Sequence, residues 1–373
     1  MRTVLLLMVL SFAVVDANAQ DPSFSQFYAN RIYLNPAFTG VDGGLAFTSS
    51  IRNQWTRVPG GFQTYYLSGE IQYPCLSSGF GLTFFQDLEG EASLKTQSVG
   101  FTYAYTIGTD QSNIHIGLGS RWVEKSIDWS RLIFSDQIDP VFGPFDPETG
   151  ALNPTSAVPI TDSQSWFDAD FGVLYRFDIK IKGKKKKGQQ KRQTVATRNS
   201  VGISIHHLPS LFGGKATDES LQGIESAIPA RLTIHAGSII PIKVFEGKTT
   251  SSLSWSPNFK FDLQSGIEVF TYGFFVMYQG LYTGVFYQNR FPIPDAENTS
   301  ELILSFGGEV FMSKSLRLNF GYSYDANLTG LGPPGGGTHE FTLRMHFTSV
   351  YPCGTGTKGK GRQNRFLDCK NFF

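Results

Sequence analysis

The stretch SLRLNFGYSYD, residues 315–325, alternates apolar with polar or small residues without a break. The apolar set is Leu316, Leu318, Phe320, Tyr322 and Tyr324. Because successive strand side chains point to opposite faces, the stretch predicts a β-strand with one apolar and one polar face. The stretch HEFTLRMHF, residues 339–347, repeats the pattern and predicts a second strand, whose apolar face carries Phe341, Leu343, Met345 and Phe347.

Two structures produce this alternation: a soluble antiparallel sheet with one wet face, and a transmembrane barrel with an apolar outside and a polar lumen. Strand number and length favour the barrel, because most predicted strands have the roughly ten residues that a tilted strand needs to cross a membrane. We therefore predict an all-β fold, a transmembrane antiparallel β-barrel of about 14 strands, with a secreted pair of sandwiches as the alternative. The predicted strands are 45–55, 62–73, 79–88, 93–107, 113–125, 166–178, 198–207, 230–240, 249–257, 263–272, 274–287, 301–312, 315–325 and 338–349.

The connections between these strands also differ in length. With the N-terminus in the periplasm, the connections from odd to even strands face outward, and they include 126–165, 208–229, 288–300 and 326–337. Most connections from even to odd strands are short, except the one at 179–197. Long outer loops and short periplasmic turns are typical of outer-membrane barrels.

The first nineteen residues have the features of a secretory signal peptide. Arg2 is followed by an apolar run to Val15 and by the small-residue site Ala17-Asn18-Ala19, so we expect residues 1–19 to be removed. The alternative, a membrane anchor, is disfavoured because the apolar run is short for a bilayer. We expect the mature chain in the cell outer membrane, and a net charge of +1 gives no reason to expect a nucleic-acid partner.

An aromatic segment at 20–44 precedes the predicted barrel at 45–350. Asp21 can cap a helix from Pro22 to Ala29, on which aromatic side chains would share a face. Our hypothesis is that this segment folds into or across the periplasmic mouth of the barrel; the alternative is a segment that becomes ordered only with a partner. The candidate plug or partner contacts are Phe24, Gln26, Phe27, Tyr28, Asn35 and Pro36.

Charged residues on the last two strands form a candidate lumen network. Its members are Arg317, Asp325, His339, Glu340 and Arg344. Paired charges in a lumen are usually structural, and the alternative is the lining of a cargo path or plug. His206 and His207 are adjacent, so on a strand they should face opposite ways.

Nothing in the sequence predicts an enzyme or a tightly bound cofactor. Nucleophile-elbow, P-loop and zinc-protease motifs are absent from it. The stretch FSDQIDPVFGPFDPETG, residues 134–150, could bind Ca²⁺ through carboxylates in an outer loop, although its ligand spacing is irregular.

Two features lie on the expected periplasmic side. The basic run KIKGKKKKGQQKRQ, residues 180–193, predicts a solvated turn, and the alternative is a dock for an acidic partner or a lipid phosphate. The second feature is the set of three cysteines: Cys75, and Cys353 and Cys369 in the Gly- and Lys-rich tail at 351–373. We favour a Cys353–Cys369 disulfide, with Cys75 bonded to a tail cysteine as the alternative.

Several motifs resemble the PorP/SprF family, in the family's order and across the chain from 20 to about 348. The first are in the opening segment, at Phe24 to Tyr28 and at Leu34-Asn35-Pro36-Ala37. The others are Arg52-Asn53-Gln54-Trp55, Ile205-His206-His207-Leu208, Gly321-Tyr322-Ser323-Tyr324-Asp325 and Gly337-Thr338-His339-Glu340, where Thr338 stands in place of an expected Ser.

This resemblance implies an outer-membrane component of the type IX secretion system of the Bacteroidota. It implies a role in the secretion or surface anchoring of large cargo proteins such as gliding adhesins. The implied partners are the secreted cargo, a periplasmic peptidoglycan-linked lipoprotein or other secretion-system subunits, and outer-membrane lipid. A channel for small solutes is the alternative function.

Overall fold

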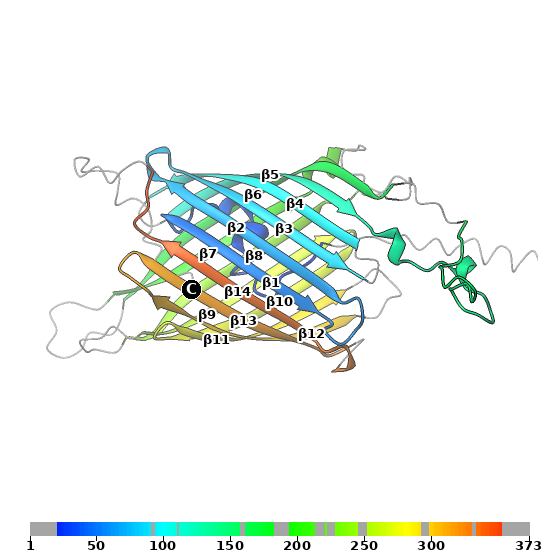
Figure 1. Ribbon diagram of the computed structural model, residues 1–373. Coiled ribbons are helices and arrows are strands. Elements are labelled where there is room, and N and C mark those ends of the chain that lie inside the picture. Colours follow the sequence, from blue (N-terminus) through cyan, green and yellow to red (C-terminus); the bar gives the residue numbers. More distant parts are fainter. Residues whose placement is uncertain are drawn as a thin grey trace, which may run out of the picture.

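The chain forms a closed antiparallel β-barrel of 14 strands, in which each strand pairs with its sequence neighbours and β1 pairs with β14 (Figure 1). The computed structural model describes residues 21–90, 94–109, 112–156, 161–182, 194–212, 221, 228–244, 252–291, 298–329 and 333–352. The predicted fold class is confirmed.

The first seven strands are β1 (Leu45–Gln54), β2 (Phe62–Tyr73), β3 (Ser78–Glu89), β4 (Leu94–Gly108), β5 (Ser112–Ser126), β6 (Ser163–Lys182) and β7 (Thr194–His206). The other seven are β8 (Arg231–Val244), β9 (Ser252–Gln264), β10 (Ile267–Tyr278), β11 (Leu281–Phe291), β12 (Thr299–Phe311), β13 (Leu316–Asn327) and β14 (Thr338–Phe347). The closing pair runs from Leu45 opposite Phe347 to Gln54 opposite Thr338, so no strand edge is left unpaired.

The two faces of the barrel wall differ as the alternation predicts. On β14, Phe341, Leu343 and Met345 are exposed on the outside, whereas Glu340 and Arg344 are buried inside. The outside carries large apolar side chains on many strands, including Phe47, Leu82, Val99, Leu118 and Phe306. A continuous exposed apolar surface of this kind is stable only when lipid covers it.

The largest errors in the predicted strand boundaries lie between residues 249 and 287, and the other boundaries differ from the structure by at most four residues. The predicted strands 263–272 and 274–287 both cross tight turns, since β9, β10 and β11 are joined by the two-residue connections Ser265-Gly266 and Gln279-Gly280. All four residues have positive φ, between 51° and 85°, as type I′ hairpin turns require. A glycine after a small or polar residue was the signal for each turn.

The connections separate the two ends of the barrel. We call the end that carries the β5–β6 connection, residues 127–162, the loop end, and the opposite end, where β2 meets β3, the turn end. The outer-membrane rule places the loop end outside the cell. The basic run falls mainly outside the described residues. Among the described residues, no helix is long and apolar enough to span a membrane.

Replacing Leu343 by arginine tests whether lipid covers the outer face. Leu343 lies mid-strand on β14 and is 46% exposed. An arginine near the bilayer midplane costs about 2–4 kcal/mol, so we expect Leu343→Arg to lower the free energy of unfolding from lipid vesicles by that amount. Urea titration measures this, with Leu343→Phe as the control. Equal stability of the two variants would show that lipid does not cover this face.

Candidate functional site: the N-terminal segment in the barrel lumen

Residues 21–44, which we call the N-terminal segment, lie inside the barrel (Figure 1). The segment contains the short helix α2 (Arg31–Leu34) and the 3-10 turn η1 (Pro36–Phe38). Of the six candidate contact residues, five are buried, and the partly buried Tyr28 packs against the same apolar cluster. All six candidates therefore lie within the lumen.

The predicted helix from Pro22 to Ala29 is not present. Residues 25–29 form turns instead, and helical structure begins only after Asn30, where the helix was expected to stop. The reason is a tertiary contact: the carboxylate of Glu340 accepts hydrogen bonds from the backbone N–H groups of Ser25 and Gln26, at 2.8 and 3.2 Å. In the predicted helix these two N–H groups would donate to the carbonyl oxygens of Asp21 and Pro22, so the contact with Glu340 replaces intrahelical hydrogen bonds.

The segment extends along the lumen and is not confined to the periplasmic mouth. Ser25 and Gln26 contact Glu340, the third residue of β14, near the loop end. Gly40 donates a hydrogen bond to Glu70 at 2.7 Å and lies against Gly79, the second residue of β3, at the turn end. The prediction placed the segment only at the periplasmic mouth, whereas its contacts reach from near the loop end to the turn end.

The first polar cluster fixes the start of the segment near the loop end. Arg52 Nη1 lies 2.8 Å from Asp325 Oδ2 and 3.5 Å from Glu340 Oε2, and all three side chains are buried. Gln26 Nε2 donates to the Glu340 carbonyl oxygen at 2.9 Å, and Gln26 Oε1 accepts from Thr342 at 2.9 Å. The carboxylates of the wall thus bind both an arginine of β1 and the backbone of the segment.

A second polar cluster holds the end of the segment near the turn end. Asp42 pairs with Arg31 of the segment and, at 2.8 Å, with Arg344 Nη2 of β14. Arg344 also lies 2.8 Å from Glu70 Oε1, the carboxylate that binds the N–H of Gly40. Buried charges are stable only when paired, so removing one member would leave the others uncompensated.

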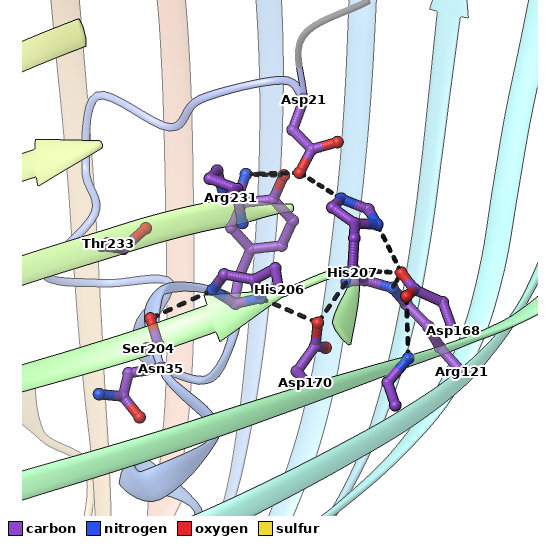
Figure 2. A network of polar contacts seen from close by, with 12 residues as sticks. Asp21, Asn35, Arg121, Asp168, Asp170, Ser204, His206, His207, Arg231 and Thr233 are labelled. Atoms are coloured by element: carbon purple, nitrogen blue, oxygen red, sulfur yellow. Dashed lines mark hydrogen bonds and ion pairs between the residues drawn. The ribbon is translucent and has the colours of Figure 1, made fainter. Parts of the chain in front are cut away.

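The third polar cluster, shown in Figure 2, holds Asp21 against β6, β7 and β8. His207 lies between two carboxylates, with Nε2 2.7 Å from Asp21 Oδ2 and Nδ1 2.7 Å from Asp168 Oδ2. Arg231 contacts Asp21 at 2.9 Å. On the other side, Arg121 bridges Asp168 and Asp170 at 2.7 and 3.1 Å.

His206 and His207 both reach the lumen, which corrects the expectation that they face opposite ways. His207 follows the last residue of β7 and has φ of +57°, so the strand alternation no longer applies to it. Both imidazoles are buried, and His206 Nδ1 lies 3.1 Å from Asp170 Oδ1. A left-handed residue at a strand end cannot be read from period-two patterning.

Asp21 and His207, the two ionisable groups of this cluster that lie outside the strands, stabilise each other's charged form. Burial would lower the pKa of His207, but the charge of Asp21 and the contact with Asp168 outweigh it and raise this pKa to about 9. Burial would raise the pKa of Asp21, but His207 and Arg231 hold it well below its usual range. At neutral pH the pair is therefore ionised.

The Asn35-Pro36-Ala37 turn lies on glycines of the wall. Asn35 Nδ2 donates to the carbonyl oxygens of Val173 and Ile203, at 3.2 and 3.1 Å. A Cβ on Gly172 would lie 2.0 Å from Asn35 Oδ1, and one on Gly117 would lie 2.2 Å from Ala37 N. The turn can approach β5 and β6 this closely only where the wall has no side chain.

Aromatic side chains of the segment pack on the opposite wall. Phe27 lies edge-on to Phe286 with ring centroids 5.9 Å apart, and Tyr28 lies edge-on to Phe275 at 4.5 Å. Phe38 belongs to the same buried cluster. The segment is thus held by apolar packing on β10 and β11 and by polar contacts elsewhere.

The five residues of the candidate lumen network do not form a single cluster in the structure. Asp325 and Glu340 meet in the first cluster and Arg344 belongs to the second, whereas Arg317 lies at the turn end, 4.0 Å from Glu309. His339 is on the outer face, one position out of phase with Glu340, and hydrogen-bonds the Tyr322 hydroxyl at 2.7 Å. Its assignment to the lumen was wrong, because residues an odd number of positions apart on a strand face opposite sides.

Sequence reasoning missed most partners of these charges. Arg52 was noted only as part of a motif, and Asp21 only as a helix cap. The other residues missed as members of the polar clusters are Arg31, Asp42, Glu70, Arg121, Asp168, Asp170 and Arg231. A charged residue on the polar face of a predicted strand indicates that its side chain enters the lumen. It does not indicate which strand supplies its partner.

The expected disulfide between Cys353 and Cys369 is wrong. Cys75, in the 3-10 turn η2 (Pro74–Leu76), is disulfide-bonded, and a chain with three cysteines cannot then pair its other two. Tyr351 lies beside Gly43, at the turn end of the barrel. Cys353 and Cys369 themselves lie outside the described residues.

The aspartates of the 134–150 stretch are engaged within their own loop. Asp136, Asp139 and Asp146 each accept hydrogen bonds from backbone N–H groups two or more residues away. Within the described ranges, no three His, Cys, Asp or Glu side chains come together in a way that could hold a metal ion. Calcium binding by this loop remains a prediction without a formed site.

Adding a methyl group to the wall should displace the segment without opening the barrel. Gly117→Ala places a Cβ against Ala37 N, and overpacking of this kind costs about 1–3 kcal/mol. We expect trypsin to cleave after Arg31 about tenfold faster in the variant than in the wild type in lipid vesicles. Gly69→Ala is the control, because its Cβ would meet only the ring of Phe47, on the outer face. Equal cleavage rates in the two variants would show that the segment does not pack against Gly117.

The contact between Asp21 and His207 should depend on pH. Since docking raises the pKa of His207 to about 9, its contribution is complete below the ordinary value of about 6.5 and is lost as pH rises through 9. We expect the wild type to resist proteinase K near residue 21 better than His207→Gln at pH 6, with the difference disappearing by pH 10. A difference that does not change with pH would refute the ion pair.

Comparison with known proteins identifies a family for this chain. A family described as "Type IX secretion system membrane protein PorP/SprF" matches residues 16–345. A comparison with curated proteins returns no match.

Among solved structures, the CymD monoaromatic hydrocarbon channel is 10% identical, with a TM-score of 0.38 over 85% of this chain and 91% of that one. The β domain of the Bordetella autotransporter BrkA is 10% identical, with a TM-score of 0.37 over 82% and 98%. A Pseudomonas aeruginosa FadL homologue is 9% identical, with a TM-score of 0.37 over 82% and 89%. Likeness at this level says nothing about function.

The family match covers the barrel, the N-terminal segment and the residues that join them. The closed barrel and its apolar outer face agree with a protein of the outer membrane. The chain belongs to the PorP/SprF family of type IX secretion system membrane proteins.

Proposed function

We propose that this protein supports the secretion or surface anchoring of large cargo proteins, such as adhesins, through its outer and periplasmic surfaces and not through its lumen. The main support is the N-terminal segment, which lies in the lumen and is held there by three polar clusters and an aromatic cluster. A folded cargo protein has no path through a lumen in this state. The partners then act at the two ends of the barrel.

The turn end suits a partner in the periplasm. A peptidoglycan-linked lipoprotein or another secretion-system subunit would meet the short turns there, and the basic run at 180–193 would favour an acidic partner or lipid phosphates. The loop end would meet the secreted cargo. Outer-membrane lipid covers the apolar wall between the two ends.

A hydrolase is the second candidate, because three residues have the spacing of a serine triad. Ser204 Oγ lies 3.2 Å from His206 Nε2, and His206 Nδ1 lies 3.1 Å from Asp170 Oδ1 (Figure 2). However, the Ser204 hydroxyl donates to the carbonyl oxygen of Leu34 at 2.7 Å, and both Ser204 and His206 are about 99% buried. These residues therefore serve better as a clamp on the N-terminal segment than as a nucleophile and base.

Conductance separates the proposed function from a channel for small solutes. We expect the full-length protein to be silent in planar lipid bilayers, and a variant lacking residues 21–40 to conduct, because a barrel of this strand number is wide enough to leave a pore. In cells, loss of the protein should reduce cargo at the surface. A stable open conductance from the full-length protein, with cargo export unchanged in its absence, would establish the channel instead.

A further inference from the structure

The β5–β6 connection, which we call the outer loop, is held together by polar contacts within the loop and exposes large apolar side chains. The buried side chain of Gln137 donates a hydrogen bond to the carbonyl oxygen of Asn153 at 2.6 Å. The Asn153 side chain in turn donates to the carbonyl oxygen of Gln137 at 2.8 Å. Asp136 accepts from the backbone and hydroxyl of Ser156, at 2.6 and 2.8 Å. Asp139 and Asp146 cap turns of the same loop. The loop is thus held by its own polar contacts, and it projects from the barrel (Figure 1).

Large apolar side chains cover the outside of this loop. Val141 is 80% exposed, Phe142 61% and Phe145 51%, and Ile133 and Ile138 are about half exposed. Two backbone bridges, Asp139 with Gly143 and Phe145 with Leu152, hold these side chains around one tip. Since the loop does not bury them, the apolar area becomes stable only when another molecule covers it.

The charge of the loop indicates what that molecule is. Residues 127–162 contain six acidic residues and one arginine, a net charge of −5. Hydrogen bonds from Ser156, Phe142 and Thr149 lower the pKa of Asp136, Asp139 and Asp146 respectively, so these carboxylates stay ionised. Like charges repel, which disfavours an anionic lipid surface, whereas a protein surface with basic residues around an apolar centre is complementary.

We propose that the tip of the outer loop, around Val141, Phe142 and Phe145, is a docking surface for a secreted protein that presents an apolar patch rimmed by lysine and arginine. This inference deepens the proposed function and rests on it, because the loop end must face the outside of the cell. The apolar side chains would supply affinity, and the carboxylates would supply orientation and a faster encounter.

Photo-crosslinking in the native outer membrane tests the proposal. A photoreactive residue in place of Phe142 should form an adduct with a secreted protein, at a peptide in which lysine or arginine flanks apolar residues. The same residue in place of Phe212, which is 84% exposed in the β7–β8 connection, is the matched control and should not. An adduct with lipid, with a second copy of this chain, or with nothing would overturn the proposal.

Variants of the tip separate its two contributions. With the photoreactive residue at Phe145, Phe142→Ser should lower the adduct yield about tenfold, the effect of losing a central apolar contact. Glu148→Lys should lower it about threefold, and added salt should mimic that loss. Neither variant should affect silence in planar bilayers. If export still depends on the protein but neither variant changes the adduct, docking at the tip fails and the proposed function stands.

Discussion

A barrel of fourteen strands encloses more space than its own inward side chains can fill, and its polar face must lie inward because lipid surrounds the outside. Charges such as Glu340, Asp325 and Arg344 therefore point into a lumen that needs both volume and hydrogen-bond partners. The N-terminal segment supplies both. Its backbone N–H groups satisfy Glu340 and Glu70, and its aromatic side chains fill the apolar side of the lumen.

The motifs by which this chain resembles its family meet at this contact. Gln26 from the first motif contacts Glu340 from the last, and Arg52 pairs with Asp325. Asn35 lies beside the β6 and β7 backbones, and His206 contacts the carbonyl oxygen of the preceding residue, Leu34. Segments far apart in the sequence thus carry one structural feature, the docked segment.

Closure of the lumen moves the functional question to the ends of the barrel. At the loop end, the outer loop is held by its own polar contacts and exposes large apolar side chains beside its carboxylates. At the turn end, Cys75 is disulfide-bonded. Under the proposed function, these two surfaces would bind partners on the two sides of the membrane.

The sequence by itself determined the barrel, its approximate strand count and the polar and apolar faces of strands such as β13 and β14, because side-chain alternation is a local property that lipid and lumen impose on a strand. It also indicated that the aromatic opening segment packs against the barrel. Only the tertiary structure decided that residues 25–29 form turns, that Arg52 pairs with Asp325, that His207 faces inward and that Cys75 is bonded. Each of these depends on a partner hundreds of residues away or on one left-handed residue, and neither leaves a periodic trace in the sequence.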